Sequence, residues 1–187
     1  METAVRIDRR VMKTKRAIHK AFLELYGEKD FEHITINDIA DRAEVNRGTV
    51  YHHYLDKFDL LDQIIHGHLS KLAEYCTLHE GESEQTLPAG ELKPVFDYFE
   101  ANYPFFSTLL ANRSSSMFRE RLTEFVSAQL RKKLAAGDRP SDIDQELNAQ
   151  FMASSFVGIV EWWIQRRMPR PPQYMAEQVS RLLAKNT

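Results

Sequence analysis

The sequence predicts an all-α protein, and three observations support this prediction. Apolar residues recur along most of the chain at the 3.6-residue period of an amphipathic helix. The strict alternation of apolar and polar residues that is typical of strands is missing, as are the Asn-Gly and Asp-Gly pairs of tight hairpins. The composition, with 43% hydrophobic and 28% charged residues in 187, is that of an ordinary globular protein of one or two domains.

The first predicted helix runs from about Lys13 to Gly27, because one apolar stripe repeats over this span and Gly27 is a plausible stop. A second, short helix opens at Thr35. Thr35 and Asp38 have the spacing of a capping box. In this motif the threonine hydroxyl accepts a hydrogen bond from a helix amide that has no partner within the helix, and the carboxylate accepts one from the backbone amide of the threonine. The buried face of this helix extends through Ala43.

A third helix is predicted from Arg47 to Tyr54 with Asn46 as its cap, and a fourth from Lys57 towards Cys76 with Asp56 as its cap. Only a few residues separate the second helix from the third. A connection this short between two short helices forces a sharp crossing, which is the geometry of a helix-turn-helix.

The stretch from Thr77 to Gly90 loses the helical period and is predicted to be a loop. Gly137 is expected to end one of the helices that follow, Ser141 with Asp144 to start another, and residues 168–172 to separate the last two. This gives about nine helices in all. The remaining helices are predicted at Glu91 to Asn102, Pro104 to Leu110, Ser115 to Ala136, Ser141 to Arg167 and Pro172 to Lys185.

Residues 31–61 carry the pattern that says most about function. A helix that lies in the major groove of DNA needs an apolar edge for docking and a polar edge with short side chains. Val50 and Tyr54, four residues apart, form the docking edge. A glycine in a helix interior costs about 0.5–1 kcal/mol relative to alanine. Gly48 therefore indicates either the close approach of a partner or the simple tolerance of a glycine near a helix end. Lys57 and Thr35 begin helices, where free amides favour anions such as phosphate, although each alone is more often structural.

These residues resemble the N-terminal DNA-binding domain of the TetR family of transcriptional regulators. The resemblance covers residues 13–61 and rests on Thr35-Ile36-x-Asp38-Ile39-Ala40, Thr49-Val50-Tyr51 and Lys57-x-x-Leu60-Leu61. It implies a three-helix DNA-binding domain in residues 1–56 and a helical ligand-binding and dimerisation domain in residues 57–187. It further implies phosphate contacts for Thr35, Thr49, Tyr51, His53 and Lys57, and base-edge contacts for Arg47, Gly48 and His52, with Asn46 counted among the DNA-binding residues.

Two positions depart from the commonest family pattern. Asn46 stands where Ser is frequent, and Asn caps a helix as well as Ser does. Glu44 stands where Gly is frequent because the turn bends sharply. The sequence leaves two alternatives open for Glu44: a left-handed backbone with its steric cost, or a turn that is built differently.

The C-terminal part is rich in aromatic residues, with 12 of the chain's 20 between Phe96 and Trp163. Each of these aromatic residues, taken alone, fits the core of a helical domain. As a group they are candidates for the lining of a pocket for a small apolar or aromatic effector, since ligand pockets are mostly apolar. The candidate pocket residues are Phe96, Phe99, Tyr103, Phe106, Phe118, Phe125 and Trp162.

The predicted helix at Ser141 to Arg167 has few charges in its centre and must be covered on nearly all sides. The rest of the subunit or a second chain can cover it, and the resemblance implies a four-helix dimer interface. An isologous dimer also supplies the two recognition helices that a palindromic operator in double-stranded DNA requires. The candidate interface residues are Phe151, Ser155, Gly158, Trp162, Val179, Leu182 and Leu183.

The expected function is therefore that of a homodimeric repressor released from its operator by a small molecule. The alternative is a coregulator or activator whose C-terminal domain binds a protein partner. No enzyme, cofactor or metal site is expected, because neighbouring histidines do not share a helix face and no phosphate-binding glycine loop occurs. The longest charge-free run has 14 residues, which is too few to cross a membrane, and no secretory signal is visible. The single cysteine needs no oxidising compartment. A cytoplasmic location is therefore expected.

A net charge of -2 taken alone argues against DNA binding, but the charge is unevenly distributed along the chain. Residues 1–20 carry seven bases and two acids, and residues 21–60 carry four bases and nine acids. The helix-turn-helix therefore offers few cations to phosphate, and affinity should depend on dimerisation and on the basic N-terminal arm.

Deletion of residues 1–12 should weaken operator binding and flatten its salt dependence, because each lost phosphate contact lowers the slope of log affinity against log salt by roughly one. Titrations of one operator duplex at several salt concentrations measure both effects. An unchanged salt slope would contradict the role given to the arm.

Overall fold

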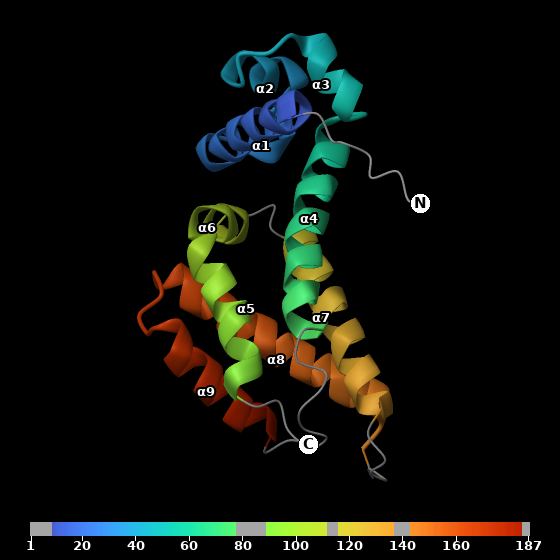
Figure 1. Ribbon diagram of the computed structural model, residues 1–187, viewed down its shortest axis with the longest axis vertical. Coiled ribbons are helices and arrows are strands. Elements are labelled where there is room, and N and C mark those ends of the chain that lie inside the picture. Colours follow the sequence, from blue (N-terminus) through green and yellow to red (C-terminus); the bar gives the residue numbers. More distant parts are fainter. Residues whose placement is uncertain (1–8, 78–88, 112–115, 137–142, 185–187) are drawn as a thin grey trace. The chain divides into compact units, whose positions relative to one another are not determined.

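The computed structural model confirms an all-α fold with the predicted helix-turn-helix near its N-terminus (Figure 1). It describes residues 9–77, 89–111, 116–136 and 143–184, which contain nine α-helices, one 3-10 helix and no strand. None of these helices is long and apolar enough to cross a membrane. The helices are α1 (Arg9–Glu28), η1 (Phe31–His33, the 3-10 helix), α2 (Ile36–Arg42), α3 (Arg47–His53), α4 (Lys57–Thr77), α5 (Ala89–Ala101), α6 (Tyr103–Ala111), α7 (Ser116–Ala136), α8 (Gln145–Gln165) and α9 (Pro172–Ala184).

Three features near the N-terminus differ from the prediction. Helix α1 begins at Arg9, so residues 9–12 are helical and only residues 1–8 of the predicted arm lie outside the described residues. Gly27 does not stop α1, which continues to Glu28, and none of the described glycines has a positive φ. The 3-10 helix η1 was not predicted, because three residues are too few to display a period.

The start of α8 also differs from the prediction. The carboxylate of Asp144 accepts a hydrogen bond from the amide of Leu147 at 2.8 Å, so Asp144 is the cap and the helix begins at Gln145. Ser141 and Gly137, the predicted start and stop signals, lie outside the described residues, as do residues 78–88 of the predicted loop. The predicted break between the last two helices is confirmed, with Pro172 as the first residue of α9.

The chain divides into an N-terminal unit, Met1–His66, and a C-terminal unit, Gly67–Thr187. The division falls inside α4, whereas the predicted domain boundary coincides with the start of that helix. In the N-terminal unit, α1 packs against α2 and α2 against α3 (Figure 1). Its core consists of the apolar faces of these helices together with η1 and the start of α4, and includes Ile18, Phe22, Tyr26, Phe31, Ile39, Val50, Tyr54 and Leu60.

The C-terminal unit is built from two helix pairs, α5 with α9 and α7 with α8, and α6 lies against α8 (Figure 1). Trp163 is fully buried, and its indole Nε1 donates a hydrogen bond to the carbonyl of Arg170 at 2.8 Å. This bond ties the segment that follows α8 to the helix itself. The amide of Met168 donates to the carbonyl of Trp163 at 2.8 Å, and Arg167 and Met168 both have left-handed backbones, so the chain turns sharply before α9.

The turn between α2 and α3 resolves the alternatives for Glu44, which adopts a left-handed backbone with a φ of 54°. The amide of Glu44 donates to the carbonyl of Asp41 at 3.2 Å, and the amide of Val45 donates to the carbonyl of Ala40 at 3.0 Å. These bonds satisfy the last carbonyls of α2. A residue with a Cβ atom pays roughly 1–2 kcal/mol in this conformation, so the turn is under steric strain.

Replacement of Glu44 by Gly should stabilise the N-terminal unit by about 0.5–1 kcal/mol, because the relief of strain exceeds the extra chain entropy of Gly in the unfolded state. Amide hydrogen exchange of α2 and α3 in the full chain measures the change. Glu44→Ala is the matched control, since it removes the same carboxylate but keeps the Cβ atom. Equal stabilisation by both variants would assign the effect to charge and contradict the strain argument.

Candidate nucleic-acid interface

Helix α3, the candidate recognition helix, has only seven residues and is held at both ends. At its start, Oδ1 of Asn46 accepts a hydrogen bond from the amide of Gly48 at 2.8 Å, which confirms Asn46 as the helix cap. Along its inner edge, Val50 and Tyr54 are buried against the rest of the N-terminal unit. The predicted docking edge is therefore the buried edge, and the other side chains of α3 are left for the surface.

Tyr54, at the end of α3, is fixed to α1 by a polar contact. Its hydroxyl lies 2.8 Å from Nε2 of His19, and the ammonium of Lys15 lies 5.7 Å from the centre of its ring. Burial, and then the charge of Lys15, lowers the pKa of His19 to about 4, while burial raises the pKa of Tyr54 to about 12. At neutral pH both groups are uncharged, which suits a bond at the edge of an apolar core.

The capping box at the start of α2 is confirmed. The amide and the hydroxyl of Thr35 each donate to Oδ2 of Asp38 at 2.8 Å, and the amide of Asp38 donates to the hydroxyl of Thr35 at 3.2 Å. Lys29 also donates to Oδ2 of Asp38 at 2.8 Å. These hydrogen bonds lower the pKa of Asp38 to about 2, and the bond from Lys29 has the largest effect. Thr35 remains exposed at the first turn of α2.

Lys57, a candidate phosphate ligand, makes contacts within the subunit that the sequence did not indicate. Its Nζ donates to the carbonyls of Phe31 and Glu32, each at 2.9 Å, and lies 4.7 Å from the centre of the Phe31 ring. Two of the three ammonium N–H groups are therefore used to hold η1 against the start of α4. The third N–H group remains for an anion at the surface.

The surface of α3 carries the predicted base-contacting residues. Arg47, Gly48, Tyr51 and His52 are exposed, and Thr49 and His53 are half-buried. The rings of His52 and His53 meet edge to face at 5.1 Å. Burial, followed by the neighbouring charges of His52 and Lys15, lowers the pKa of His53, so this ring is neutral at pH 7.

Gly48 has a local structural role in addition to its exposed position. A Cβ atom at residue 48 would lie 3.3 Å from Oδ1 of Asn46, which is tighter than an ordinary contact. Glycine therefore leaves the capping oxygen undisturbed. Apart from its two chain neighbours and the backbone of α3 itself, no other atom of the described residues lies within 4 Å of that Cβ position, so the outer side of the first turn stays open.

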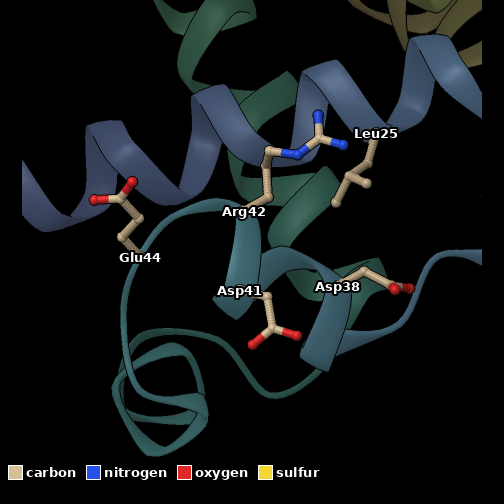
Figure 2. A pocket seen from close by; sticks show the side chains of 5 residues that line it. All are labelled: Leu25, Asp38, Asp41, Arg42 and Glu44. Carbon is tan, nitrogen blue, oxygen red and sulfur yellow. The ribbon is translucent and has the colours of Figure 1, made fainter.

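A surface hollow of about 440 Å³ lies elsewhere in this unit, lined by Leu25 of α1 and by Asp38, Asp41, Arg42 and Glu44 (Figure 2). Arg42 reaches towards α1, where its two terminal nitrogens donate to the carboxylate of Glu28 at 2.8 Å each. The remaining charges of the lining are acidic and repel phosphate. The described residues hold no group of three or more side chains that would bind a metal ion.

Comparisons with known proteins agree with this geometry. The family described as "Bacterial regulatory proteins, tetR family" matches residues 18–64, which contain the helix-turn-helix. The family described as "Transcriptional regulator C-terminal region" matches residues 90–185, about half of the chain.

The chain belongs to the TetR family of transcriptional regulators.

Individual relatives of this TetR-family protein are distant. It is 28% identical over 189 residues to YxbF, an uncharacterised regulator of Bacillus subtilis. The aligned region covers 97% of this chain but only 47% of YxbF, so the chain spans about half the length of that relative. It is also 28% identical to the repressor KstR2 of Rhodococcus jostii, over 74% of each chain. A TetR regulator of Streptococcus agalactiae has the same fold, with a TM-score of 0.64, 26% identity and coverage of 94% and 96% of the two chains.

The C-terminal unit separates the candidate pocket residues into two groups. Phe96, Phe99, Phe106 and Phe118 are buried, with Phe99 and Phe106 ring centres 4.6 Å apart and Phe106 and Phe118 5.9 Å apart. Phe96 contacts the buried Trp163, whose ring centre is 5.3 Å away. The other three predicted residues are not among these ring contacts: Tyr103 and Phe125 are half-buried and Trp162 is 47% exposed.

Sequence reasoning missed a polar group inside the same unit. The ring of His68 in α4 stacks on Phe105 in α6 with centres 3.7 Å apart, and its Nδ1 lies 2.8 Å from the hydroxyl of Tyr98 in α5. Burial, followed by the charges of Tyr75 and Glu74, raises the pKa of Tyr98 to about 12. No local signal announces this group, because its members come from three separate helices.

The predicted dimer residues also fall into two groups. Phe151, Gly158 and Trp162 in α8 and Leu182 in α9 are exposed, and Ser155 is half-buried. Val179 and Leu183 are buried in their own subunit. Leu147 and Ser154, which are not among the predicted interface residues, share the exposed face of α8 with Phe151, Gly158 and Trp162.

The low pKa of His19 predicts a specific pH dependence of stability. The unfolded histidine has a pKa near 6.5 and the folded one a pKa of about 4, so the unfolded state gains a proton first as the pH falls. The contribution of His19 is complete above pH 6.5 and is lost between pH 6.5 and 4. After discounting for partial exposure of the ring, we expect a loss on the order of 2 kcal/mol.

Unfolding in urea at pH 7 and pH 4.5 tests this expectation with the variant His19→Gln, which cannot gain a proton. The variant should lose less stability between the two pH values than the unaltered protein does. Other groups titrate alike in both proteins and cancel in the comparison. An equal loss in both would show that His19 does not titrate in this range.

Proposed function

We propose that this TetR-family protein is a homodimeric repressor that binds a palindromic operator through α3 and the start of α2. The exposed face of α3 carries the proposal, because its buried edge is fully used for docking while Arg47, Gly48, Tyr51 and His52 are exposed. The first turn of such a helix is the part that reaches base edges in the major groove. Thr35 and Lys57, at the starts of two further helices, are suited to phosphate contacts that fix the orientation on the duplex.

A homodimer is supported by the exposed face of α8. Leu147, Phe151 and Trp162 are 65%, 58% and 47% exposed and follow one another at helical spacing, with Ser154 and Gly158 between them. An apolar stripe of this length is unusual at the surface of a monomer. The small residues allow a second helix to approach closely, and an isologous contact buries the same stripe of both copies.

Release by a small apolar or aromatic effector is the regulation we propose. It is supported by the density of aromatic side chains in the C-terminal unit and by the half-buried polar pair of His68 and Tyr98, since ligand sites combine apolar walls with a few polar atoms. The relative KstR2 carries the name of a repressor, which favours repression over activation for this chain as well.

Selection of bound duplexes from a random DNA library tests the proposed DNA binding directly. We expect an inverted repeat whose half-sites are one helical turn apart, about 34–36 Å between centres. Replacement of Val50 by Ala tests the docking, because a loose α3 should lose specific binding while α8 and α9 stay intact. Recovery of no preferred sequence would reject the proposal, and recovery of a single unrepeated half-site would reject the dimeric mode.

Introduction of a charge into the α8 stripe should separate the two copies. We expect Phe151→Glu to weaken the dimer by about 100-fold or more, since a central aromatic anchor contributes 2 kcal/mol or more and a buried unpaired charge adds to the loss. Sedimentation at micromolar concentration measures the change. Ala101→Glu, at an exposed residue of α5, is the matched control and should leave the dimer intact. A monomer in the unaltered protein would refute the interface.

A further inference from the structure

Arg47 and Tyr51 form a pair on the exposed side of α3. They lie one helical turn apart, and Nη2 of Arg47 donates a hydrogen bond to the hydroxyl of Tyr51 at 3.2 Å. The central carbon of the guanidinium lies 5.3 Å from the centre of the Tyr51 ring. Tyr51 is 46% exposed, so its ring is available as a support for the guanidinium at the surface.

The two arginines of the helix-turn-helix are in different electrostatic situations. Arg42 is bound through both terminal nitrogens to Glu28 and so has little capacity left for a partner. Arg47 has no carboxylate partner among the described residues, and only one of its five N–H groups is used, on a neutral hydroxyl. Its charge and its planar fork therefore remain available to a ligand.

We propose that Arg47 reads a guanine in each operator half-site and that Tyr51 is the residue that positions its guanidinium. The inference rests on the DNA-binding function proposed above and names one base that the site selects. The fork of arginine matches the O6 and N7 acceptors of guanine in the major groove, which is the commonest specific contact of this side chain. Contact with Tyr51 restricts the guanidinium before binding, so less side-chain freedom is lost in the complex.

The neighbourhood of Arg47 favours a base over a phosphate as its target. Arg47 is the first residue of α3, where the ends of recognition helices contact base edges. Gly48 follows it without a side chain, and the outer side of that position is open, so a base edge is able to approach the fork closely. The hydroxyl of Tyr51 accepts from Arg47 and still has its own proton for a phosphate oxygen, which reconciles its positioning role with a backbone contact.

The test uses the full chain and the operator obtained by library selection. Each conserved guanine of the half-site is replaced in turn by 7-deazaguanine, which keeps its base pairing but lacks the N7 acceptor. At the guanine that Arg47 contacts, this replacement should lower the affinity of the unaltered protein by about 5- to 100-fold. Arg47→Gln should bind the normal and the modified duplex equally well at that position.

Tyr51→Phe separates positioning from charge. This variant keeps the aromatic support but removes the hydroxyl, so discrimination between the two duplexes should fall by about 2- to 10-fold while thermal unfolding stays unchanged. Thr49→Ala, which alters a predicted phosphate contact on the same helix, is the control and should weaken both duplexes alike. Unchanged discrimination in Tyr51→Phe would refute the positioning role.

The outcomes distinguish this inference from the proposed function. If the protein selects an operator but Arg47→Gln weakens all duplexes by the same factor, Arg47 binds phosphate and the guanine assignment is wrong, although the DNA-binding function stands. If no sequence is selected from the library, both the function and the inference fail.

Discussion

The interface depends on the attachment of one very short helix. Seven residues are too few for a helix to be stable by itself in water, where about 12–15 are needed for even marginal stability. The position of α3 is therefore set by its surroundings: the cap from Asn46, the burial of Val50, and the contact of Tyr54 with His19 on α1. The side chains of α3 that are proposed to face DNA owe their positions to these three attachments.

The elements and their ends could largely be predicted because their signals are local. Thr35 with Asp38, Asn46 before α3 and the prolines before α9 act within a few residues of themselves. The tertiary partners could not be predicted in the same way. Lys57 binds carbonyls more than twenty residues earlier in the chain, and His68 meets rings from two later helices, so nothing in the surrounding sequence identifies these contacts. The roles of the DNA-facing residues came from family resemblance and remain predictions.

Three of the four cations in residues 21–60 are engaged within the subunit, which gives the low net charge a structural meaning. Lys29 holds Asp38, Arg42 holds Glu28, and Lys57 holds η1, so these groups stabilise the arrangement of helices first. Phosphate must compete with such contacts or use the N–H groups that remain. Few phosphate contacts give weak general affinity for DNA, so the proposed operator binding requires the close fit of two copies to one site.

The chain has two tryptophans, which are adjacent in sequence and opposite in environment. Trp163 is enclosed and hydrogen-bonded to the carbonyl of Arg170, whereas Trp162 is on the exposed stripe of α8. Both belong to the C-terminal unit, and the N-terminal unit has none. Intrinsic tryptophan fluorescence therefore observes only the C-terminal unit. Trp162 is accessible to a soluble quencher in a single subunit and shielded in the proposed dimer, whereas Trp163 is enclosed in either state, so fluorescence quenching separates events at the α8 surface from events in the core.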